Sequence, residues 1–175
     1  MKTQFALSLR IIHWVMAVLV LAMLFIGAGM VSTVTEWHLT LYSWHKPIGI
    51  LILVLVLVRI AVRLSTGAPE LPADLKPPVK LFAKLSHLAL YASMLAMPLI
   101  GWGMLSAAGT PVSLGAGIVL PPILPVSAEW FAFLRPLHRL LAYAFFLLIL
   151  GHLTAGLYHG FVRRDGVLKS ISLKR

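Results

Sequence analysis

The chain contains a long apolar stretch near its start, in which residues 11–30 read IIHWVMAVLVLAMLFIGAGM. This stretch has no aspartate, glutamate, lysine or arginine, and about 20 such residues suffice for one helix across the hydrocarbon core of a bilayer. We therefore predict a transmembrane helix over residues 7–30. A removed signal peptide would have a short apolar core followed by a cleavage pattern of small residues. No such pattern is found here, so we expect the helix to be retained.

The rest of the sequence has the same membrane character. Of the 175 residues, 60% are hydrophobic and 11% are charged, which is too little charge to cover a water-soluble domain. Three further spans are expected over residues 43–64, 82–106 and 136–162. The predicted fold class is therefore all-α, with residues 1–175 forming one domain, an integral four-helix bundle in the lipid bilayer.

The connection over residues 107–135 is the longest one. It is rich in glycine and proline and has no charge before Glu129, so it is too interrupted to form a fifth span. We expect it to lie along the membrane surface, with Trp130, Phe131 and Phe133 at the interface. His38 is expected to be a solvated loop residue.

The net charge of +10 does not indicate a nucleic-acid partner, because the basic residues flank the apolar spans. On the predicted topology one side of the membrane has three basic residues, Lys46, Arg135 and Arg139. The other side has twelve: Lys2, Arg10, Arg59, Arg63, Lys76, Lys80, Lys84, Arg163, Arg164, Lys169, Lys174 and Arg175. This asymmetry predicts that both termini are cytoplasmic. The absence of cysteine excludes disulfides and thiolate metal sites.

Histidines are the candidate ligands. Six of the seven lie within or at the ends of predicted spans: His13, His45, His87, His138, His152 and His159. Ionisable groups at membrane depth are costly and usually face a partner inside the bundle, although a single histidine often serves only as a hydrogen bond between helices. His138 and His152 are fourteen positions apart, which places both rings on one helix face, about 21 Å apart along the axis. On the predicted topology His45 is level with His138 near the outer surface, and His13 is level with His152 in the inner half.

Steps of fourteen residues from the other histidines reach positions that suit a wide planar cofactor. From His13 the step leads to Gly27 and from His87 to Gly101. Both glycines are expected at the outer level, where they let a cofactor come close to the backbone. Phe145 is midway between the two levels on the histidine face of the last helix.

Three basic residues are candidate partners for the anionic groups of such a cofactor. Arg59 is fourteen residues from His45 and is expected at the inner level. Lys46 and Arg139 directly follow the two outer histidines. The alternative is that Lys46 and Arg139 are ordinary interfacial anchors.

Paired histidines at two depths favour two haems b, each held by two imidazoles from different helices. Zinc would need a third or fourth close protein ligand. Ligation by two histidines fills both axial positions of the iron, so the expected role is to accept and pass on electrons. Two other inner pairings stay open, His13 with His159 and His87 with His152.

Several short motifs, in this order and spacing, resemble the bacterial cytochrome b561 family. They are RIIHW at 10–14, WHKPIG at 44–49, VRIAVR at 58–63, LSH at 85–87, MPLIG at 97–101, LH at 137–138 and GH at 151–152. The resemblance covers nearly the whole chain. It implies a four-helix, di-haem quinone oxidoreductase of the bacterial inner (cytoplasmic) membrane.

The resemblance also implies roles for the histidines. His13 and His152 would be the axial ligands of the inner haem, and His45 and His138 those of the outer haem. His87 and His159 would lie near a ubiquinone site on the cytoplasmic side, with hydrogen bonding between helices as the alternative.

Three functions follow from these expectations. Members of the family that act alone are similar to superoxide oxidases, which implies an enzyme that takes electrons from superoxide outside and reduces ubiquinone. The second function is a cytochrome b anchor subunit for a periplasmic redox partner such as a dehydrogenase. The third is a haem-free membrane transporter.

Overall fold

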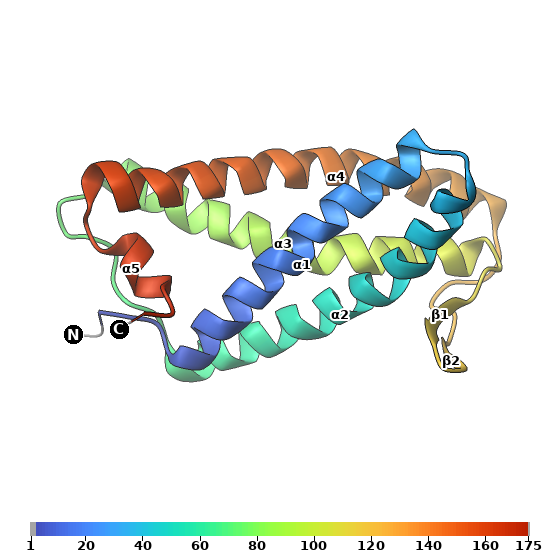
Figure 1. Cartoon of the computed structure of the whole chain (residues 1–175), viewed down its shortest axis with the longest axis horizontal. Helices are drawn as coiled ribbons and strands as arrows, with labels where there is room; N and C mark the ends of the chain where they lie inside the picture. Colours follow the sequence, from blue (N-terminus) through green and yellow to red (C-terminus); the bar gives the residue numbers. More distant parts are fainter. Residues whose placement is uncertain (1–2, 175) are drawn as a thin grey trace.

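A computed structural model describes residues 3–174, which form a bundle of four long helices (Figure 1). The helices are α1 (Leu7–Ser32), α2 (Glu36–Thr66), α3 (Pro77–Ala107) and α4 (Ala128–Leu157). A π-helical segment, η1 (Tyr158–Arg163), continues α4, and the short helix α5 (Val167–Ile171) follows it. Within the described residues, four helical segments are long and apolar enough to cross a membrane. The prediction of four such spans is confirmed.

Three of the long helices begin earlier than the sequence predicted. α3 begins at Pro77, because first-turn positions tolerate proline where the backbone N–H has no helical partner. α4 begins after Ser127, whose hydroxyl oxygen accepts a hydrogen bond from the Trp130 backbone N–H at 3.2 Å. α2 begins at Glu36, so His38 is helical and its Nδ1 lies 2.9 Å from the Met30 carbonyl oxygen. The expectation of a solvated loop at His38 is wrong.

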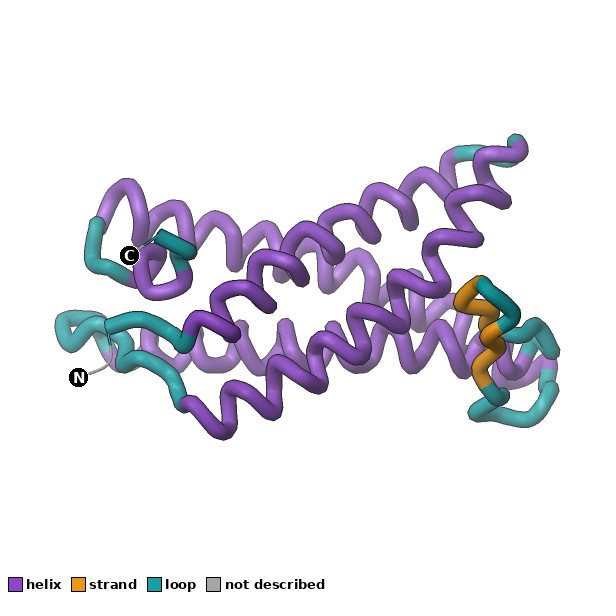
Figure 2. Tube along the Cα trace, turned by 60° about the horizontal axis from the view of Figure 1, so that its bottom comes forward, coloured by secondary structure: helices purple, strands orange, loops and turns teal. Residues whose placement is uncertain are grey.

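The connection between α3 and α4 is more ordered than predicted. It contains an antiparallel hairpin of β1 (Val112–Gly115) and β2 (Ile118–Leu120), at one end of the bundle (Figure 2). Gly115, Ala116 and Gly117 all have positive φ, and this run of left-handed residues makes a tight turn. A hydropathy pattern does not indicate such a turn. The all-α prediction is wrong for this hairpin.

The interfacial aromatic residues of this connection are also placed differently. Trp130, Phe131 and Phe133 belong to the first turns of α4, so the expectation that they lie in a surface loop is wrong. Trp130 and Phe133 are both exposed, and their rings make an edge-to-face contact with centroids 6.3 Å apart.

The four helices associate as two pairs. α1 packs along α2, and α3 packs along α4, while α2 also touches α3. The buried apolar core comprises Met16, Val20, Ile52, Leu53, Val56 and Phe145. Most other large apolar side chains of the helices face outward, as lipid-facing helices require.

The two ends of the bundle differ. Both termini and the connection between α2 and α3 lie at one end, and the hairpin lies at the other (Figure 1). At the first end the terminal segments are hydrogen-bonded, since the backbone N–H of Phe5 donates to the Ser170 carbonyl at 3.0 Å. The indole N–H of Trp14 donates to the Ile171 carbonyl at 3.0 Å. The C-terminal segment is thereby held against the start of α1.

Candidate cofactor-binding sites

The first candidate site is formed by His45 of α2 and His138 of α4. Their ring centroids are 6.2 Å apart and their ring planes are inclined by 66°. Two imidazole nitrogens that share one metal ion at about 2.0 Å put the ring centroids about 6 Å apart. The observed separation therefore fits one metal ion between the rings.

The ring nitrogens of this pair indicate that a group belongs there. The Nδ1 atoms of His45 and His138 are buried and have no hydrogen-bond partner, which is unusual for buried polar atoms. A metal ion or a polar group of a bound molecule would supply the partner that these nitrogens lack.

Glycines lie beside both outer rings. A Cβ atom on Gly101 would lie 3.3 Å from Cε1 of His138, and a Cβ on Gly27 would lie 4.0 Å from Cε1 of His45. The absence of side chains at these two positions leaves space for a flat group next to the rings. The structure thus puts each glycine next to one ring of the outer pair, and their packing against a cofactor stays a prediction.

The second candidate site is centred on His152 of α4. Its ring centroid lies 6.2 Å from that of His13 of α1, with the planes inclined by 73°. His87 of α3 is also a neighbour, at 5.5 Å and 68°. No ring contact joins His13 to His159 within residues 3–174, so that alternative pairing gains no support.

Helix packing distinguishes the two neighbours of His152. α3, which carries His87, packs directly against α4, and the His87 and His152 centroids, at 5.5 Å, are closer than the about 6 Å expected of two imidazoles on one metal ion. α1, which carries His13, packs mainly against α2. The His13–His152 and His45–His138 pairs thus each join α4 to a helix outside its own packed pair, at the same 6.2 Å separation.

Within the described residues, no three or more histidine, cysteine or acidic side chains converge as a metal site would require. The two sites therefore suit a metal whose other ligands come from the cofactor itself, as porphyrin nitrogens do. The paired donors, the partnerless buried nitrogens and the glycines all fit haem.

A family model described as prokaryotic cytochrome b561 matches residues 4–172. The chain belongs to the prokaryotic cytochrome b561 family. Membership makes it a transmembrane electron-transport protein that binds haem b and confirms the resemblance seen in the sequence.

Three curated relatives agree with this assignment. Cytochrome b561 homolog 2 of Escherichia coli (strain K12) is 30% identical over 90% of this chain and 85% of its own length. Probable superoxide oxidase CybB of Yersinia pestis is 28% identical over 75% of this chain and 74% of its own length. Cytochrome b561 homolog 1 of Escherichia coli (strain K12) is 26% identical over 79% of this chain and 78% of its own length.

Arginines without acidic partners surround the inner histidines of this cytochrome. Arg59 donates to the Leu9 carbonyl at 2.9 Å and to the Tyr91 hydroxyl at 3.1 Å. The guanidinium of Arg63 lies 5.3 Å from the centroid of the Phe5 ring. Neither arginine forms an ion pair with a carboxylate in the described part of the chain. Their charges are available to the carboxylates of a haem.

Arg10 was not singled out by the sequence. It is buried, at 6% exposure, and its Nη1 donates to the Gln4 side chain and to the Ser172 carbonyl, both at 2.9 Å. Its Nε has no hydrogen-bond partner. Only the fold of the C-terminal segment over α1 reveals this role, so nothing in the local sequence indicated it.

The two outer basic candidates differ in their surroundings. The ammonium group of Lys46 lies 4.5 Å from the centroid of the Tyr42 ring, in a cation–π contact that holds it near the outer pair. The Tyr42 ring stacks in turn on His38, with centroids 6.4 Å apart and planes inclined by 6°. Arg139 is exposed on α4.

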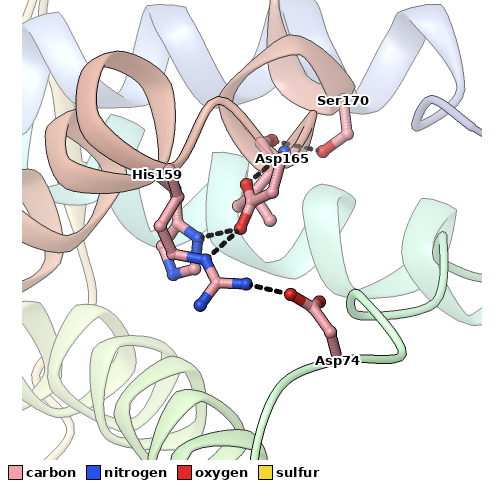
Figure 3. Close-up of polar contacts among 6 residues, drawn as sticks. Asp74, His159, Asp165 and Ser170 are labelled. Atoms are coloured by element: carbon pink, nitrogen blue, oxygen red, sulfur yellow. Dashed lines mark hydrogen bonds and ion pairs between the residues drawn. The ribbon is translucent and has the colours of Figure 1, made fainter.

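His87 and His159, the two candidates for quinone contact, are not brought together. His87 is exposed on α3 and close to His152, and no ring contact joins it to His159 among residues 3–174. The Nδ1 of His159 instead lies 2.6 Å from Oδ2 of Asp165 (Figure 3). Asp165 was not among the candidates that the sequence indicated.

Proposed function

We propose that this cytochrome transfers electrons from superoxide, on the outer side of the bacterial cytoplasmic membrane, to ubiquinone on the inner side through two haems b. The observation that carries the proposal is the pair of 6.2 Å histidine contacts, His45–His138 and His13–His152. The likeness to a probable superoxide oxidase of Yersinia pestis supports the choice of donor.

Haem bound by two histidines supplies a one-electron redox couple and has no open axial position for substrate. In this chain His45 and His138 would hold the outer haem, and His13 and His152 the inner one. Arg59 is placed to neutralise propionates at the inner level. Lys46 and Arg139 have the same role at the outer level. Gly27 and Gly101 leave room beside the outer rings.

Phe145 occupies the space between the two levels. It is 7% exposed and belongs to the buried core with Met16, Val20, Ile52, Leu53 and Val56. An apolar ring at this position keeps water out of the bundle centre. The two histidine pairs are then separated by an apolar layer that excludes water.

The reaction balances with superoxide as the donor. Two superoxide ions each lose one electron and become dioxygen, while one ubiquinone gains two electrons and two protons and becomes ubiquinol. A haem held by His45 and His138 would accept these electrons one at a time.

The outer surface attracts an anion only weakly. Lys46, Arg135 and Arg139 face Glu36 and Glu129 there, so the sum of three positive and two negative charges is about +1. Electrostatic steering would therefore raise the rate of encounter with superoxide only modestly.

The orientation follows from charge. Both termini and the α2–α3 connection share one end of the bundle (Figure 1), and the predicted basic residues of that end outnumber those of the other end by twelve to three. The positive-inside rule makes this end cytoplasmic. The hairpin then faces the periplasm.

Purified protein in lipid nanodiscs provides the test. A reduced-minus-oxidised spectrum with a haem-to-protein ratio gives the cofactor type and number. Superoxide generated enzymatically should reduce the haems, and a soluble ubiquinone analogue should reoxidise them. Haems that superoxide leaves oxidised would remove superoxide as the donor, and a pigment-free protein would remove the whole proposal.

A second function is an anchor subunit for a periplasmic redox protein such as a dehydrogenase. It is favoured by the exposed apolar side chains of the outer loop, among them Ile118, Val119 and Val126. Co-purification of a soluble partner that reduces these haems faster than superoxide does would select this function. The haem-free transporter has no support, because the family binds haem b.

A further inference from the structure

We propose that Asp165 is a positioning residue that fixes the ring of His159 and helps it to deliver a proton to the reduced quinone. This inference rests on the proposed ubiquinone reduction and adds a residue and a proton route to it. It is carried by the geometry of the segment that follows α4.

The His159 ring is held by one short contact. Its Nδ1 lies 2.6 Å from Oδ2 of Asp165, and the two side chains are 16% and 11% exposed. Arg163 donates to the same Oδ2 at 2.9 Å, and the backbone N–H of Val167 donates to Oδ1 at 3.3 Å. The carboxylate accepts all of these hydrogen bonds, so its partner Nδ1 must carry a proton. The Nε2 atom of His159 is then the nitrogen that can form a hydrogen bond with a substrate.

This contact depends on a break in the helix. In a continuous α-helix, side chains six residues apart differ by about 240° around the axis, so His159 and Asp165 would point in different directions. The π-helical segment η1 (Tyr158–Arg163) and the left-handed residues Arg164 (φ 55°) and Gly166 (φ 85°) turn the chain back. π-Helical turns are frequent at functional sites. A left-handed non-glycine residue such as Arg164 stores strain that must be offset locally.

The network continues to the surface of the same end of the bundle. The Nη2 of Arg163 donates to Oδ2 of Asp74 at 2.5 Å (Figure 3), and the Asp74 side chain is 70% exposed. Asp74 lies in the connection between α2 and α3, so three chain segments meet here. On the proposed orientation the network joins His159 to cytoplasmic water, where protons for quinone reduction are available.

The surroundings of Asp165 contain few other charges. His159 and Arg163 of η1 face it, and Asp74 reaches it only through Arg163. The contact from α5 is the backbone N–H of Val167, which donates to Asp165. Lys169, also on α5, makes no ion pair with Asp165. From α1, Arg10 is hydrogen-bonded to Gln4 and to the Ser172 carbonyl instead. From α4 and η1, His152 contacts His13 and His87, and Tyr158 contacts the His159 ring.

The proton step follows from this arrangement. The carboxylate holds the ring with its Nδ1–H toward Asp165, so in the protonated ring the Nε2–H is the group that can donate to a quinone oxygen. When the quinone has received two electrons, one proton passes from Nε2 to that oxygen and His159 becomes neutral with its Nδ1–H retained. Water then restores the Nε2 proton, and the second proton of the quinol comes from water at the same end. No atom of Asp165 is transferred.

The first test uses the unmodified protein. Histidine labelled with nitrogen-15, with the His159 signal assigned by its loss in His159→Gln, should show a proton on Nδ1 of His159 at every pH measured. A His159 that carries its single proton on Nε2 at high pH would overturn the proposal. This measurement does not depend on whether an Asp165 variant folds.

The second test compares variants that keep their haem. Haems reduced beforehand with dithionite are mixed with a soluble ubiquinone analogue, and the reoxidation rate is measured against pH. Asp165→Asn should slow reoxidation by about 10-fold or more, with a shifted pH profile, and Asp165→Glu should recover part of the rate. Glu70→Gln is the matched control, because Glu70 is an exposed carboxylate of the α2–α3 connection that forms no ion pair with His159, Arg163 or Asp165, and it should stay within about 2-fold of the wild type.

The outcomes separate the two proposals. If wild-type haems are not reoxidised by the quinone, ubiquinone reduction itself is wrong, whatever Asp165 does. If the wild type reacts and Asp165→Asn matches it at every pH, ubiquinone reduction stands and the role of Asp165 is overturned. A slowed Asp165→Asn variant with an unchanged haem spectrum supports the role of Asp165.

Discussion

His45 and His138 lie with their ring centroids 6.2 Å apart, although one is on α2 and the other on α4, which belong to different packed helix pairs. Apolar packing of α2 on α4 does not explain this approach. The proposed outer haem, bound by both rings, would explain it.

We predict that His138→Ala removes the outer haem and leaves the inner one, because the two proposed sites share no ligand. The haem-to-protein ratio should fall by about half, with one component of the reduced spectrum retained. His38→Ala is the control, since His38 binds the Met30 carbonyl and should leave both haems. Loss of both haems from His138→Ala would show that the sites are not independent.

A second comparison tests whether His13 or His87 is the partner of His152 at the inner haem. His13→Ala should lose the inner haem, and His87→Ala should keep it, because the His87 and His152 centroids are 5.5 Å apart, closer than two imidazoles that share one iron. Optical spectra of the two purified variants measure this. Haem loss in His87→Ala with retention in His13→Ala would reverse the proposed pairing.

Gly101→Leu should lower occupancy of the outer site. Even the Cβ of such a residue would lie 3.3 Å from the His138 ring, and the rest of the side chain would take the space beside it. Gly156→Ala is the control, because no atom of another part of the chain lies within 4 Å of the position that its added methyl group would take on α4. Haem titration of each variant should show weaker binding at one site for Gly101→Leu only. Equal haem binding by both variants would mean that the outer haem lies elsewhere.

The C-terminal segment should loosen in acid. Burial alone raises the pKa of Asp165, but hydrogen bonds from His159, the Val167 N–H and Arg163 outweigh it and lower this pKa below its ordinary value. A carboxyl group with a lowered folded-state pKa stabilises the fold above about pH 4, its unfolded value, and this contribution is lost as the pH falls through the folded-state pKa.

Hydrogen exchange over residues 164–174 measures this effect. The protection factors of these amides, corrected for the intrinsic pH dependence of exchange, should fall on acidification in the wild type and depend less on pH in Asp165→Asn. An equally steep pH dependence in both proteins would assign the effect to another group.

The topology can be tested with fusions. A reporter that matures only in the cytoplasm should be active after residue 174 and inactive when it is inserted at Ala116 in the hairpin turn. The reason is the twelve-to-three distribution of basic residues between the two ends. The opposite pattern would place the hairpin, and with it the proposed donor site, in the cytoplasm.

The sequence predicted the spans because their signal is local. Twenty apolar residues such as 11–30 form a helix whatever surrounds them. The fourteen-residue step from His87 to Gly101 also used only helix geometry, and the structure places Gly101 beside the outer ring. The start of α2 was missed because Glu36, Trp37 and His38 lack the apolar character of a span, although they continue the helix beyond it.

The contacts that the sequence did not predict join residues that only a turn of the chain or the packing of two segments brings together. Asp165 reaches His159 only because η1 and Gly166 turn the chain, and no helical period predicts such a turn. Arg10 is buried by Ser172 and its neighbours, which lie at the other end of the sequence. Tyr91 could not be assigned to Arg59 without knowing how α2 and α3 pack.

The division of the bundle into α1–α2 and α3–α4 has a consequence for biogenesis. Each proposed haem takes one ligand from the α1–α2 pair and one from α4. The cofactors would therefore link two helix pairs whose direct contact is mainly the limited one between α2 and α3. Haem binding would then contribute directly to the stability of the folded bundle, since the free energy of binding becomes free energy of folding. We expect cells starved of porphyrin to accumulate a loosened apoprotein that membrane proteases remove.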